Sequence, residues 1–395
     1  MRPARTARGR PGLLRALGSS LGLCLLAPWQ AAQAQSEEAA GDERWRLTGS
    51  YRALGVQQRP AERPAQHSLA QRLRLSLSGE LASWPQGGLR LQLDHDSELL
   101  AGNSAYRAAL DEALAAPQEQ ALRDRSVWWQ DRRSLGRQQL FRAFVQARSG
   151  DFSATLGRQR IALGQGRLWS SLDLLNPPNP QQIEREDFIG VDALLVEQAL
   201  GPLSRASLVL APTPGGGPQR WLLQWRTHWQ AMDLSFSHAR YGQDRLLAVD
   251  LAGQWADAGL RAEFTRTAPA AGSAHFSGVL GADYAFNARL SASLEWYWRS
   301  RRAAEQAPGP GQARPPQGAH AIGLNLSYEL TPLLKLQGLW LRNTGDGSQL
   351  IAPGFSWSLS ENAVLNAGLQ RFSGSARSEY GPGGRLAFAR YQRYF

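Results

Sequence analysis

Alternation of apolar and polar residues with a period of two dominates this 395-residue chain, in segments of about ten residues. The segment RLSASLEWYWR (289–299) has leucine, alanine or tryptophan at every second position and arginine, serine, glutamate or tyrosine between them. The segments RLRLSLSGEL (72–81), GLRLQLDHD (88–96) and HAIGLNLSYEL (320–330) repeat the pattern. Successive side chains of a β-strand point to opposite faces, so each segment would form a strand with one apolar and one polar face.

Short and long connections follow each other along the chain. The candidate strands are eighteen segments: 44–55, 68–82, 88–97, 138–149, 151–161, 189–200, 203–211, 219–230, 231–240, 244–256, 258–267, 274–286, 288–299, 318–330, 333–343, 348–359, 362–373 and 384–395. A soluble β-sandwich would also alternate, but short turns at one end and long loops at the other are typical of a transmembrane barrel. We therefore predict an all-β fold, a transmembrane antiparallel β-barrel of about 18 strands with short periplasmic turns and long extracellular loops.

The N-terminal residues have the features of a secretory signal peptide. A basic leader enters an apolar region from about Leu13 to Ala27, and Ala32-Gln33-Ala34 supplies a cleavage pattern of small residues. A short transmembrane anchor is the alternative, but the apolar run is shorter than the roughly 20 residues that a bilayer requires. We expect residues 1–34 to be cleaved and residues 35–395 to form the barrel in the cell outer membrane.

The charge of the chain indicates the class of solute that it would meet. Lysine and arginine outnumber aspartate and glutamate by 44 to 33, and loss of the five arginines of the leader lowers the net charge from +11 to about +6. Such a charge could suit nucleic acid, but export makes an anionic small solute or polymer the better expectation. Cys24, the one cysteine, lies in the leader, so the mature chain must be stable without disulfides.

Two long outer loops, 98–137 and 162–188, differ in composition. Residues 103–125 have helical composition interrupted by Pro117, so we expect one or two short helices there. The second of these loops contains the run NPPNP (176–180), which favours an extended, polyproline-like course without helix or strand pairing. Glycines would permit the sharp turn that precedes this run. The residues expected to shape the loop are Gly157, Gly164, Gly166, Asn176, Pro177, Pro178 and Pro180.

Residues 162–188 are the third long outer loop of the predicted barrel, and in porin-type barrels the third loop often folds inward and narrows the channel. Arg158, Arg160 and Arg167 would lie near the narrow part. They could form a charged constriction that selects the permeant, or a clamp in which they pair with acids and fix the loop to the wall. Arginines on the polar strand faces would line the lumen, because each would cost roughly 2–4 kcal/mol in lipid at the midplane. An arginine-rich lumen favours anions, although arginines near the strand ends could instead bind lipopolysaccharide phosphates. The pore and constriction candidates are Arg158, Arg160, Arg167, Asp173 and Glu184, together with Arg72, Arg74, Arg142 and Arg148.

Parts of the sequence resemble known outer-membrane families. The segment LGRQRIALGQGR followed by FIGVDALLVE resembles proteins related to the alginate-export porins, over about residues 141–197. This resemblance implies an eighteen-stranded barrel with an arginine-rich pore for an anionic polysaccharide, and it carries over only Gly157, Arg158 and Gln159. The NPPNP run is similar to that of several uncharacterised outer-membrane barrel families. The end of the chain, RLAFARYQRYF, resembles the assembly signal of outer-membrane barrels through its terminal Phe395, and departs from it at Arg393.

The sequence shows no arrangement of residues typical of an enzyme or a metal site. The six histidines lack metal-ligand spacing, so we expect neither a metal nor another cofactor. His238 after Ser237, and His95 between two aspartates, are only loose matches to a hydrolase site, and we do not expect an enzyme.

The predicted function is therefore an outer-membrane channel for passive transport or export of polar, anionic solutes or a polysaccharide. A plugged barrel that serves as a binding or assembly component of an envelope export complex is one alternative, and an outer-membrane hydrolase is another. The expected partners are outer-membrane lipid and lipopolysaccharide, the barrel assembly machinery and the anionic permeant, without nucleic acid.

Overall fold

A computed structural model of the protein describes residues 44–115, 120–122, 124–184, 190–213, 220–270, 272–300, 316 and 318–395. Contacts within the chain define one unit, Arg46–Tyr394, and a second that holds Met1–Trp45 and Phe395. The barrel belongs to the first unit. The predicted signal peptide, residues 1–34, lies outside the described residues, and the role of Phe395 in assembly stays a prediction.

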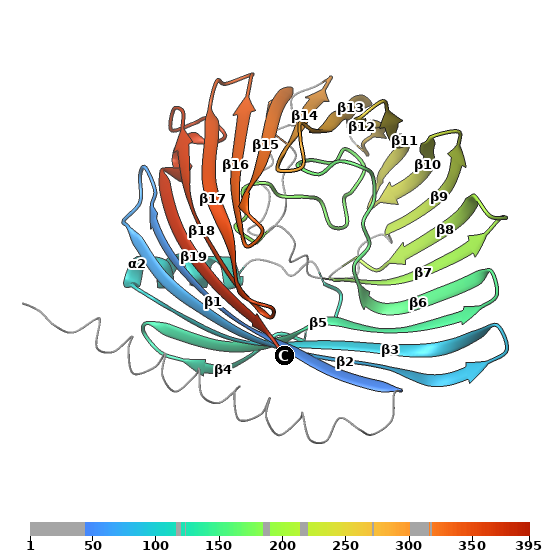
Figure 1. Cartoon of the computed structure of the whole chain (residues 1–395), viewed down its shortest axis with the longest axis horizontal. Coiled ribbons are helices and arrows are strands. Elements are labelled where there is room, and N and C mark those ends of the chain that lie inside the picture. The colour runs from blue at the N-terminus through green and yellow to red at the C-terminus, as the bar shows by residue number, and fades with distance from the viewer. Residues whose placement is uncertain are drawn as a thin grey trace, which may run out of the picture. The chain divides into compact units, whose positions relative to one another are not determined.

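The wall of the barrel is one antiparallel sheet, in which strands that follow each other along the chain pair and β1 closes the ring on β19 (Figure 1). The strands of the wall are β1 (Trp45–Arg59), β2 (Gln66–Trp84), β3 (Gly87–Gly102), β5 (Ser134–Ser149), β6 (Phe152–Gln159), β7 (Val191–Ala199), β8 (Ser204–Ala211), β9 (Arg220–Trp229), β10 (Met232–Tyr241), β11 (Asp244–Trp255), β12 (Ala258–Ala268), β13 (His275–Ala285), β14 (Leu290–Arg299), β15 (His320–Thr331), β16 (Leu334–Asn343), β17 (Gln349–Ser360), β18 (Ala363–Ser373) and β19 (Arg385–Tyr394). Each of the eighteen segments expected from the sequence overlaps one of these strands, which confirms the predicted fold class.

The connection between β3 and β5 contains two further elements. The helix α2 (Ser104–Ala115) was expected from the composition of this loop. The short strand β4 (Ser126–Gln130), which pairs with the first residues of β5, was not. The predicted loop 98–137 was too long, because β3 continues to Gly102 and β5 already begins at Ser134. A 3-10 helix, η1 (Gly381–Gly383), lies between β18 and β19.

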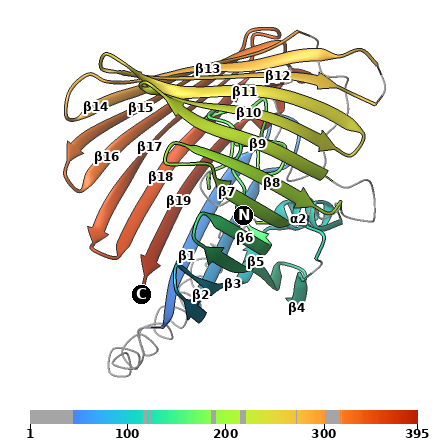
Figure 2. The ribbon, with the colours of Figure 1, turned by 90° about the vertical axis from the view of Figure 1, so that its right-hand side faces the viewer.

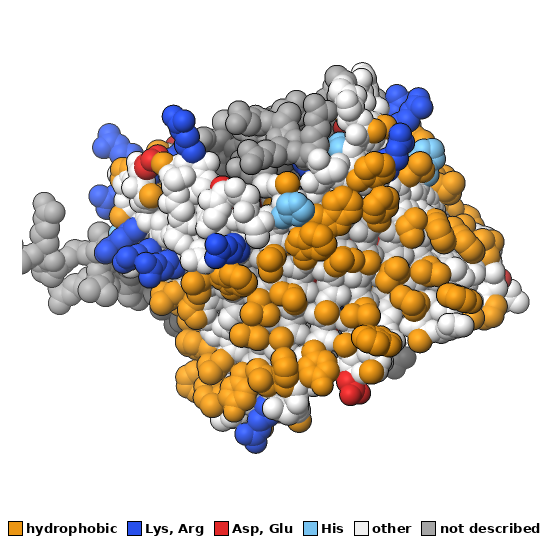
Figure 3. All heavy atoms as spheres, turned by 90° about the horizontal axis from the view of Figure 1, so that it is seen from above, with side chains coloured by type: hydrophobic (Ala, Val, Ile, Leu, Met, Phe, Trp, Pro, Cys, Tyr) orange, Lys and Arg blue, Asp and Glu red, His pale blue; other side chains and the backbone are white. Residues whose placement is uncertain are grey.

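The period of two decides which side chains meet the membrane. Leu294 of β14 pairs with Leu324 of β15, and the neighbouring Glu295 pairs with Gly323. Cross-strand partners share a face of the sheet, so the leucines lie on one side of the wall and Glu295 lies on the other. Apolar side chains cover much of the outer surface seen in Figure 3. This is the surface that a barrel wall needs in contact with lipid.

The two ends of the barrel differ in their connections (Figure 2). At one end the strands join through tight turns, and in three of these turns a residue other than glycine has a positive φ: Gln86, Gln230 and Ala256. At the other end lie the long connections between β3 and β5, between β6 and β7 and between β18 and β19. Short turns on the periplasmic side and longer loops outside are typical of outer-membrane barrels.

Residues 160–184, which follow β6, lie inside the ring of strands and are called the inward loop below (Figure 1, green). Ile161, Leu163 and Leu172 pack in one apolar cluster with residues of β7 to β11. Leu168 and Trp169 pack in a second cluster with residues of β13 to β17. The described residues include no helix that is long and apolar enough to cross a membrane.

Candidate functional site

Glu263 of β12 holds the inward loop by its backbone. One carboxylate oxygen accepts hydrogen bonds from the amides of Gln165 and Gly166, at 2.6 and 2.7 Å. The other accepts from the Ser171 amide at 2.7 Å and from the hydroxyls of Ser170 and Ser171. Glu263 is buried, and a buried carboxylate is stable only when donors replace the water that it has lost. The loop supplies those donors.

Glu295 of β14 holds the next turn of the loop in the same way. It accepts from the amides of Arg167, Leu168 and Trp169 at 2.6, 2.8 and 3.3 Å. Its side chain is fully buried, and the guanidinium of Arg261 also donates to it at 3.1 Å. Arg261 and Arg167 both pair with Asp283 of β13, and Gln165 donates to Asp250 of β11. We call these four acids the carboxylate seat: Asp250, Glu263, Asp283 and Glu295.

Two glycines, one in the wall and one in the loop, allow the loop to approach the carboxylate seat closely. Gly323 faces Glu295 across β14 and β15, and a Cβ at this position would overlap the side chain of Leu168. Gly164 has a φ of +78°, and a Cβ there would overlap the carboxylate of Glu263. A side chain at position 323 would require Leu168 to shift, and one at position 164 would strain the backbone and require Glu263 to shift.

Asp173, expected from the sequence as a partner of arginines, instead organises the loop internally. Its carboxylate accepts from the backbone amides of Leu163, Leu175 and Asn176 at 3.1, 3.0 and 2.8 Å. Burial raises the pKa of Asp173 to about 6, because the loss of water outweighs these hydrogen bonds. Asn176 adds a hydrogen bond from its side chain to the carbonyl of Ile161 at 3.0 Å.

The other loop-shaping residues act in different ways. Gly157, like Gly164, has a positive φ. Gly166 does not, and its place depends on space instead, since a Cβ would overlap the carbonyl of Trp169. Pro177 and Pro178 have neither helical nor strand structure, and Pro180 begins a turn. The run NPPNP therefore follows an irregular course without ladder pairing.

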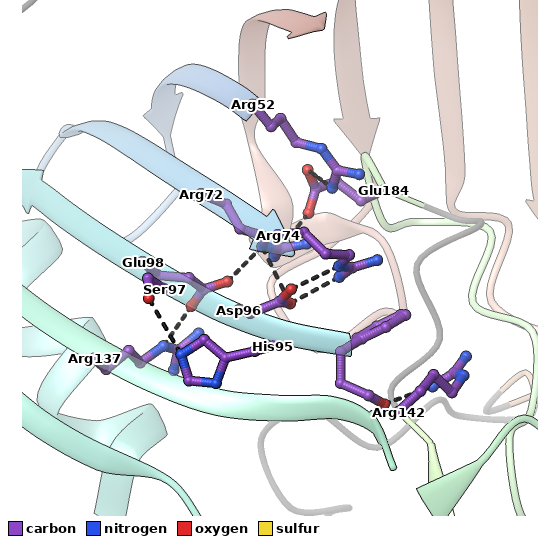
Figure 4. Close-up of polar contacts among 11 residues, drawn as sticks. Arg52, Arg72, Arg74, His95, Asp96, Ser97, Glu98, Arg137, Arg142 and Glu184 are labelled. Atoms are coloured by element: carbon purple, nitrogen blue, oxygen red, sulfur yellow. Dashed lines mark hydrogen bonds and ion pairs between the residues drawn. The ribbon is translucent and has the colours of Figure 1, made fainter. Parts of the chain in front are cut away.

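On the other side of the ring, β2, β3 and β5 carry interleaved arginines and carboxylates (Figure 4). Arg74 donates to both oxygens of Asp96, at 2.6 and 2.7 Å. Arg72 and Arg137 each donate to one oxygen of Glu98, at 2.6 and 2.5 Å. Both carboxylates are buried, whereas the arginines are partly exposed. The bidentate pairing of Arg74 with Asp96 fixes the plane of its guanidinium group.

Phe141 of β5 orients two of the guanidinium groups. The Cζ atoms of Arg74 and Arg142 lie 3.4 and 4.2 Å from the centroid of its ring. Such cation–π contacts are worth about 0.5–2 kcal/mol each. Arg142 also donates to the carbonyl of Phe141 at 2.9 Å. We call the set Arg52, Arg72, Arg74, Arg137 and Arg142 the arginine wall.

The inward loop reaches the arginine wall at Glu184. Its carboxylate lies 2.6 Å from Arg52 Nη1 and 3.5 Å from Arg72 Nη2 (Figure 4). A cavity of about 280 Å³ lies between this part of the loop and the wall. Its lining residues are Arg72, Asp96, Glu98, Arg137, Gln139, Phe141, Gln182, Ile183 and Glu184.

The arginines expected at a constriction do not meet at one place. Arg158 is 3% exposed, and it pairs with Asp192 and Asp124 at 2.9 and 2.6 Å. These contacts tie β6 to β7 and to the segment before β4, as in the clamp interpretation, but they do not hold the inward loop. Arg167 is 62% exposed on the carboxylate seat, and Arg160 is exposed at the start of the loop.

Sequence reasoning missed Glu98 and Arg137, which it placed in an outer loop. The signal was present, because Asp94, Asp96 and Glu98 continue the period of two beyond the predicted end of the strand. Arg148, a predicted pore residue, is exposed near the turn that joins β5 to β6. In the sheet it lies opposite Ser153 of β6.

In the described part of the chain, the two histidines weighed for a hydrolase contact a serine and a tryptophan. His95 Nε2 lies 3.3 Å from Ser97 Oγ (Figure 4), and the ring of His238 packs edge-on against Trp221 at 5.0 Å between centroids. Within the described part of the chain, no hydrogen bond joins either histidine to a carboxylate. Nor do three or more His, Cys, Asp or Glu residues of that part form a metal-binding group.

No protein-family model matches the sequence, and no curated protein matches it. Solved structures do match. OccAB3 of Acinetobacter baumannii shares 10% identity at a TM-score of 0.58, over 89% of this chain and 99% of that one. OccK5 (OpdH) and OccD3 (OpdP) of Pseudomonas aeruginosa share 10% and 9% at a TM-score of 0.58, over 89% of this chain and 98% and 91% of theirs. The shared feature is the fold, a closed antiparallel barrel of eighteen strands.

Proposed function

We propose that this protein is an outer-membrane channel through which polar, anionic solutes pass passively. The observation that carries the proposal is a difference between the charged residues on the two sides of the inward loop. The acids of the carboxylate seat bind the loop or Arg261, whereas the cavity on the other side borders the arginine wall. An arginine-lined passage lowers the barrier for anions.

The exposure of the charged groups beside the cavity supports the choice of anions. Arg72 and Arg137 line the cavity and stay partly exposed, whereas Asp96 and Glu98 are buried. A solute in the cavity would therefore meet these guanidinium groups more readily than these two carboxylates. The likeness of the fold to the Occ/Opd outer-membrane porins supports a channel in the outer membrane.

The test is the reversal potential of the refolded full chain in a planar bilayer under a salt gradient. We expect a stable conductance with a clear preference for anions. A cation-preferring conductance would contradict the role of the arginine wall. A folded barrel without conductance would contradict the channel and favour a plugged barrel that acts as a binding or assembly component.

Transport of an anionic polysaccharide is a narrower form of the proposal. It rests on the resemblance of the segment around Gly157, Arg158 and Gln159 to the alginate-export porins. Short uronate oligomers added to one side of the bilayer should block the current transiently if they enter the arginine-lined passage. Small organic anions alone should do so if the cavity near Glu184 is too narrow for sugars.

A further inference from the structure

Three arginines lie side by side on the outside of the barrel. Arg59 of β1 lies directly opposite Arg385 of β19 in the sheet, and Arg385 lies opposite Arg371 of β18. Gln370 donates to the carbonyl of Gln181 in the inward loop, so Gln370 faces the lumen and its neighbour Arg371 faces away. Cross-strand partners share a face, so all three arginines point outward. We call Arg59, Arg371 and Arg385 the arginine row.

The arginine row has no counter-charge within the described part of the chain. All three side chains are exposed, and none makes a hydrogen bond or an ion pair there. Glu62, the nearest acid along the chain, makes no ion pair in that part either. Like charges directly opposite each other destabilise a sheet. The row therefore costs stability unless an anion from outside the chain compensates for it.

The row lies where the apolar surface of the barrel meets the end with long connections. Arg59 ends β1, Arg385 begins β19 and Arg371 lies two residues before the end of β18. On the same outward face, Leu369 is 57% exposed, and Ile351, the partner of Arg371 on β17, is 45% exposed. Figure 3 shows basic side chains gathered at one edge of the apolar surface. In such barrels this edge faces the headgroups of the outer leaflet.

A second opposed pair lies at the same end of the barrel. Arg240, near the end of β10, lies directly opposite Arg245, near the start of β11, in the sheet. Both side chains are exposed. His238, two residues before Arg240, packs against Trp221 on the outer face. Two separate groups of opposed arginines at one rim indicate a belt of positive charge rather than a single chance pairing.

We propose that the arginine row binds a phosphate-bearing lipid of the outer leaflet. Neighbouring strands lie about 4.8 Å apart, so the three guanidinium groups span about 10 Å, enough for a headgroup with two phosphates. Arginine binds phosphate through paired, charge-assisted hydrogen bonds. The acyl chains of the lipid then lie along Leu369 and Ile351. This site acts on the outside of the wall and does not depend on what passes through the lumen.

The test measures binding of bis-phosphorylated lipid A to the full chain in detergent by native mass spectrometry. Arg385→Gln removes the middle of the row, and Arg289→Gln removes an exposed arginine from a turn between β13 and β14 at the other end. We expect Arg385→Gln to weaken binding about tenfold or more, as the loss of charge-assisted hydrogen bonds implies. Arg289→Gln should leave binding unchanged, although it changes the net charge equally.

Equal affinity in the two variants would overturn the proposal, whether both lose binding or neither does. Two competitors separate the possible sources of the phosphate. Inorganic phosphate at the same concentration should fail to displace lipid A, and displacement would assign the row to a free anion instead. Lipid A without phosphates should bind weakly, and equal binding would assign the contact to the apolar surface alone. The circular dichroism of each variant verifies that the barrel is folded.

Discussion

The carboxylate seat and the arginine wall use the same types of side chain for different purposes. On the seat, the oxygens of Glu263 and Glu295 accept hydrogen bonds from the backbone of the inward loop. On the wall, the oxygens of Asp96 and Glu98 accept from arginines that border a cavity. The hydrogen bonds that the loop amides donate to Glu263 and Glu295 fix the position of the loop. A carboxylate bound to arginine adjusts a charge that a solute can meet.

This difference explains why counting charges around the lumen is a poor guide to selectivity. Glu263 and Glu295 face the lumen side of the wall, yet the loop covers both and both are buried. The fields of buried, fully hydrogen-bonded acids are partly offset by the dipoles of their donors. We therefore expect mutations on the seat to change the width and stability of the passage, and mutations on the wall to change its preference for anions.

The largest effect should follow Glu263→Ala. This change removes the acceptor for five hydrogen bonds from the loop and leaves buried amides unpaired. Unpaired buried donors cost about 1–3 kcal/mol each, so we expect a loss of about 3 kcal/mol or more in the free energy of unfolding. With the loop released, single-channel conductance should rise or become noisy. Denaturant unfolding and bilayer recordings measure the two effects.

Glu80→Ala is the matched control for Glu263→Ala. Glu80 is an exposed acid of β2. Its replacement by alanine removes the same charge from the barrel at a position outside the inward loop. We expect its unfolding and its conductance to resemble those of the wild type. If Glu263→Ala behaves like Glu80→Ala, the seat does not hold the loop, and the contrast between the two sides fails.

The next effect concerns the wall. Arg72 and Arg137 both line the cavity and both donate to Glu98. In the double variant Arg72→Gln with Arg137→Gln, the remaining acids dominate the cavity. We expect the ratio of anion to cation permeability to fall about tenfold or more, since charged linings change local ion concentrations by such factors. The reversal potential under a salt gradient measures this ratio.

The double variant Arg72→Lys with Arg137→Lys separates charge from packing at this site. It keeps both positive charges but loses the hydrogen bonds that the two guanidinium groups donate to Glu98 through Nε. Its selectivity should stay close to that of the wild type. Selectivity lost equally in the glutamine and lysine variants would mean that the shape of the wall, and not its charge, sets the preference.

A smaller change of opposite sign should follow Glu184→Gln. This residue of the inward loop neutralises Arg52 and Arg72, and its side chain is about one-fifth exposed. A partly exposed ion pair is worth about 1 kcal/mol or less, so anion preference should rise by about fivefold or less. An unchanged reversal potential would show that permeating ions do not pass Glu184. A fall would contradict the assignment of the wall as the selective side.

The sequence predicted the wall of the barrel better than the contacts inside it. Alternation reports directly which face of a strand meets lipid, and for this reason all eighteen strands were found. It also places Arg72 and Arg74 on a polar face. It contains no information on partners across the lumen, because the contact of Arg52 with Glu184 joins residues 132 positions apart. Such contacts depend on the course of the loop.

The inward loop shows the same limit. Its glycines and prolines indicated a stiff segment, and Gly164 does take a positive φ. Its seat could not be predicted, because the donors are backbone amides, which every residue carries. Arg158 illustrates the converse case. Its charge indicated a pore residue or a clamp, and only the three-dimensional contacts with Asp192 and Asp124 reveal a clamp inside the wall.

The smallest effect should come from Asp173, through pH. Its pKa rises from 3.8 to about 6 on burial, so the folded loop holds a proton that the unfolded chain releases at lower pH. The free energy of unfolding therefore falls as pH rises between these values, by about 1 kcal/mol from pH 5 to pH 7. Asp173→Asn should abolish this part of the pH dependence, as denaturant unfolding at both pH values would measure.

Asp151→Asn, in an exposed turn, is the control because it removes an acid that the solvent already reaches. If this variant and Asp173→Asn keep the same pH dependence as the wild type, burial of Asp173 does not limit the loop. If only Asp173→Asn loses it, the loop is held more firmly under mildly acidic conditions. Conductance should then be steadier at pH 5 than at pH 7, while anion preference, set on the arginine wall, should change little.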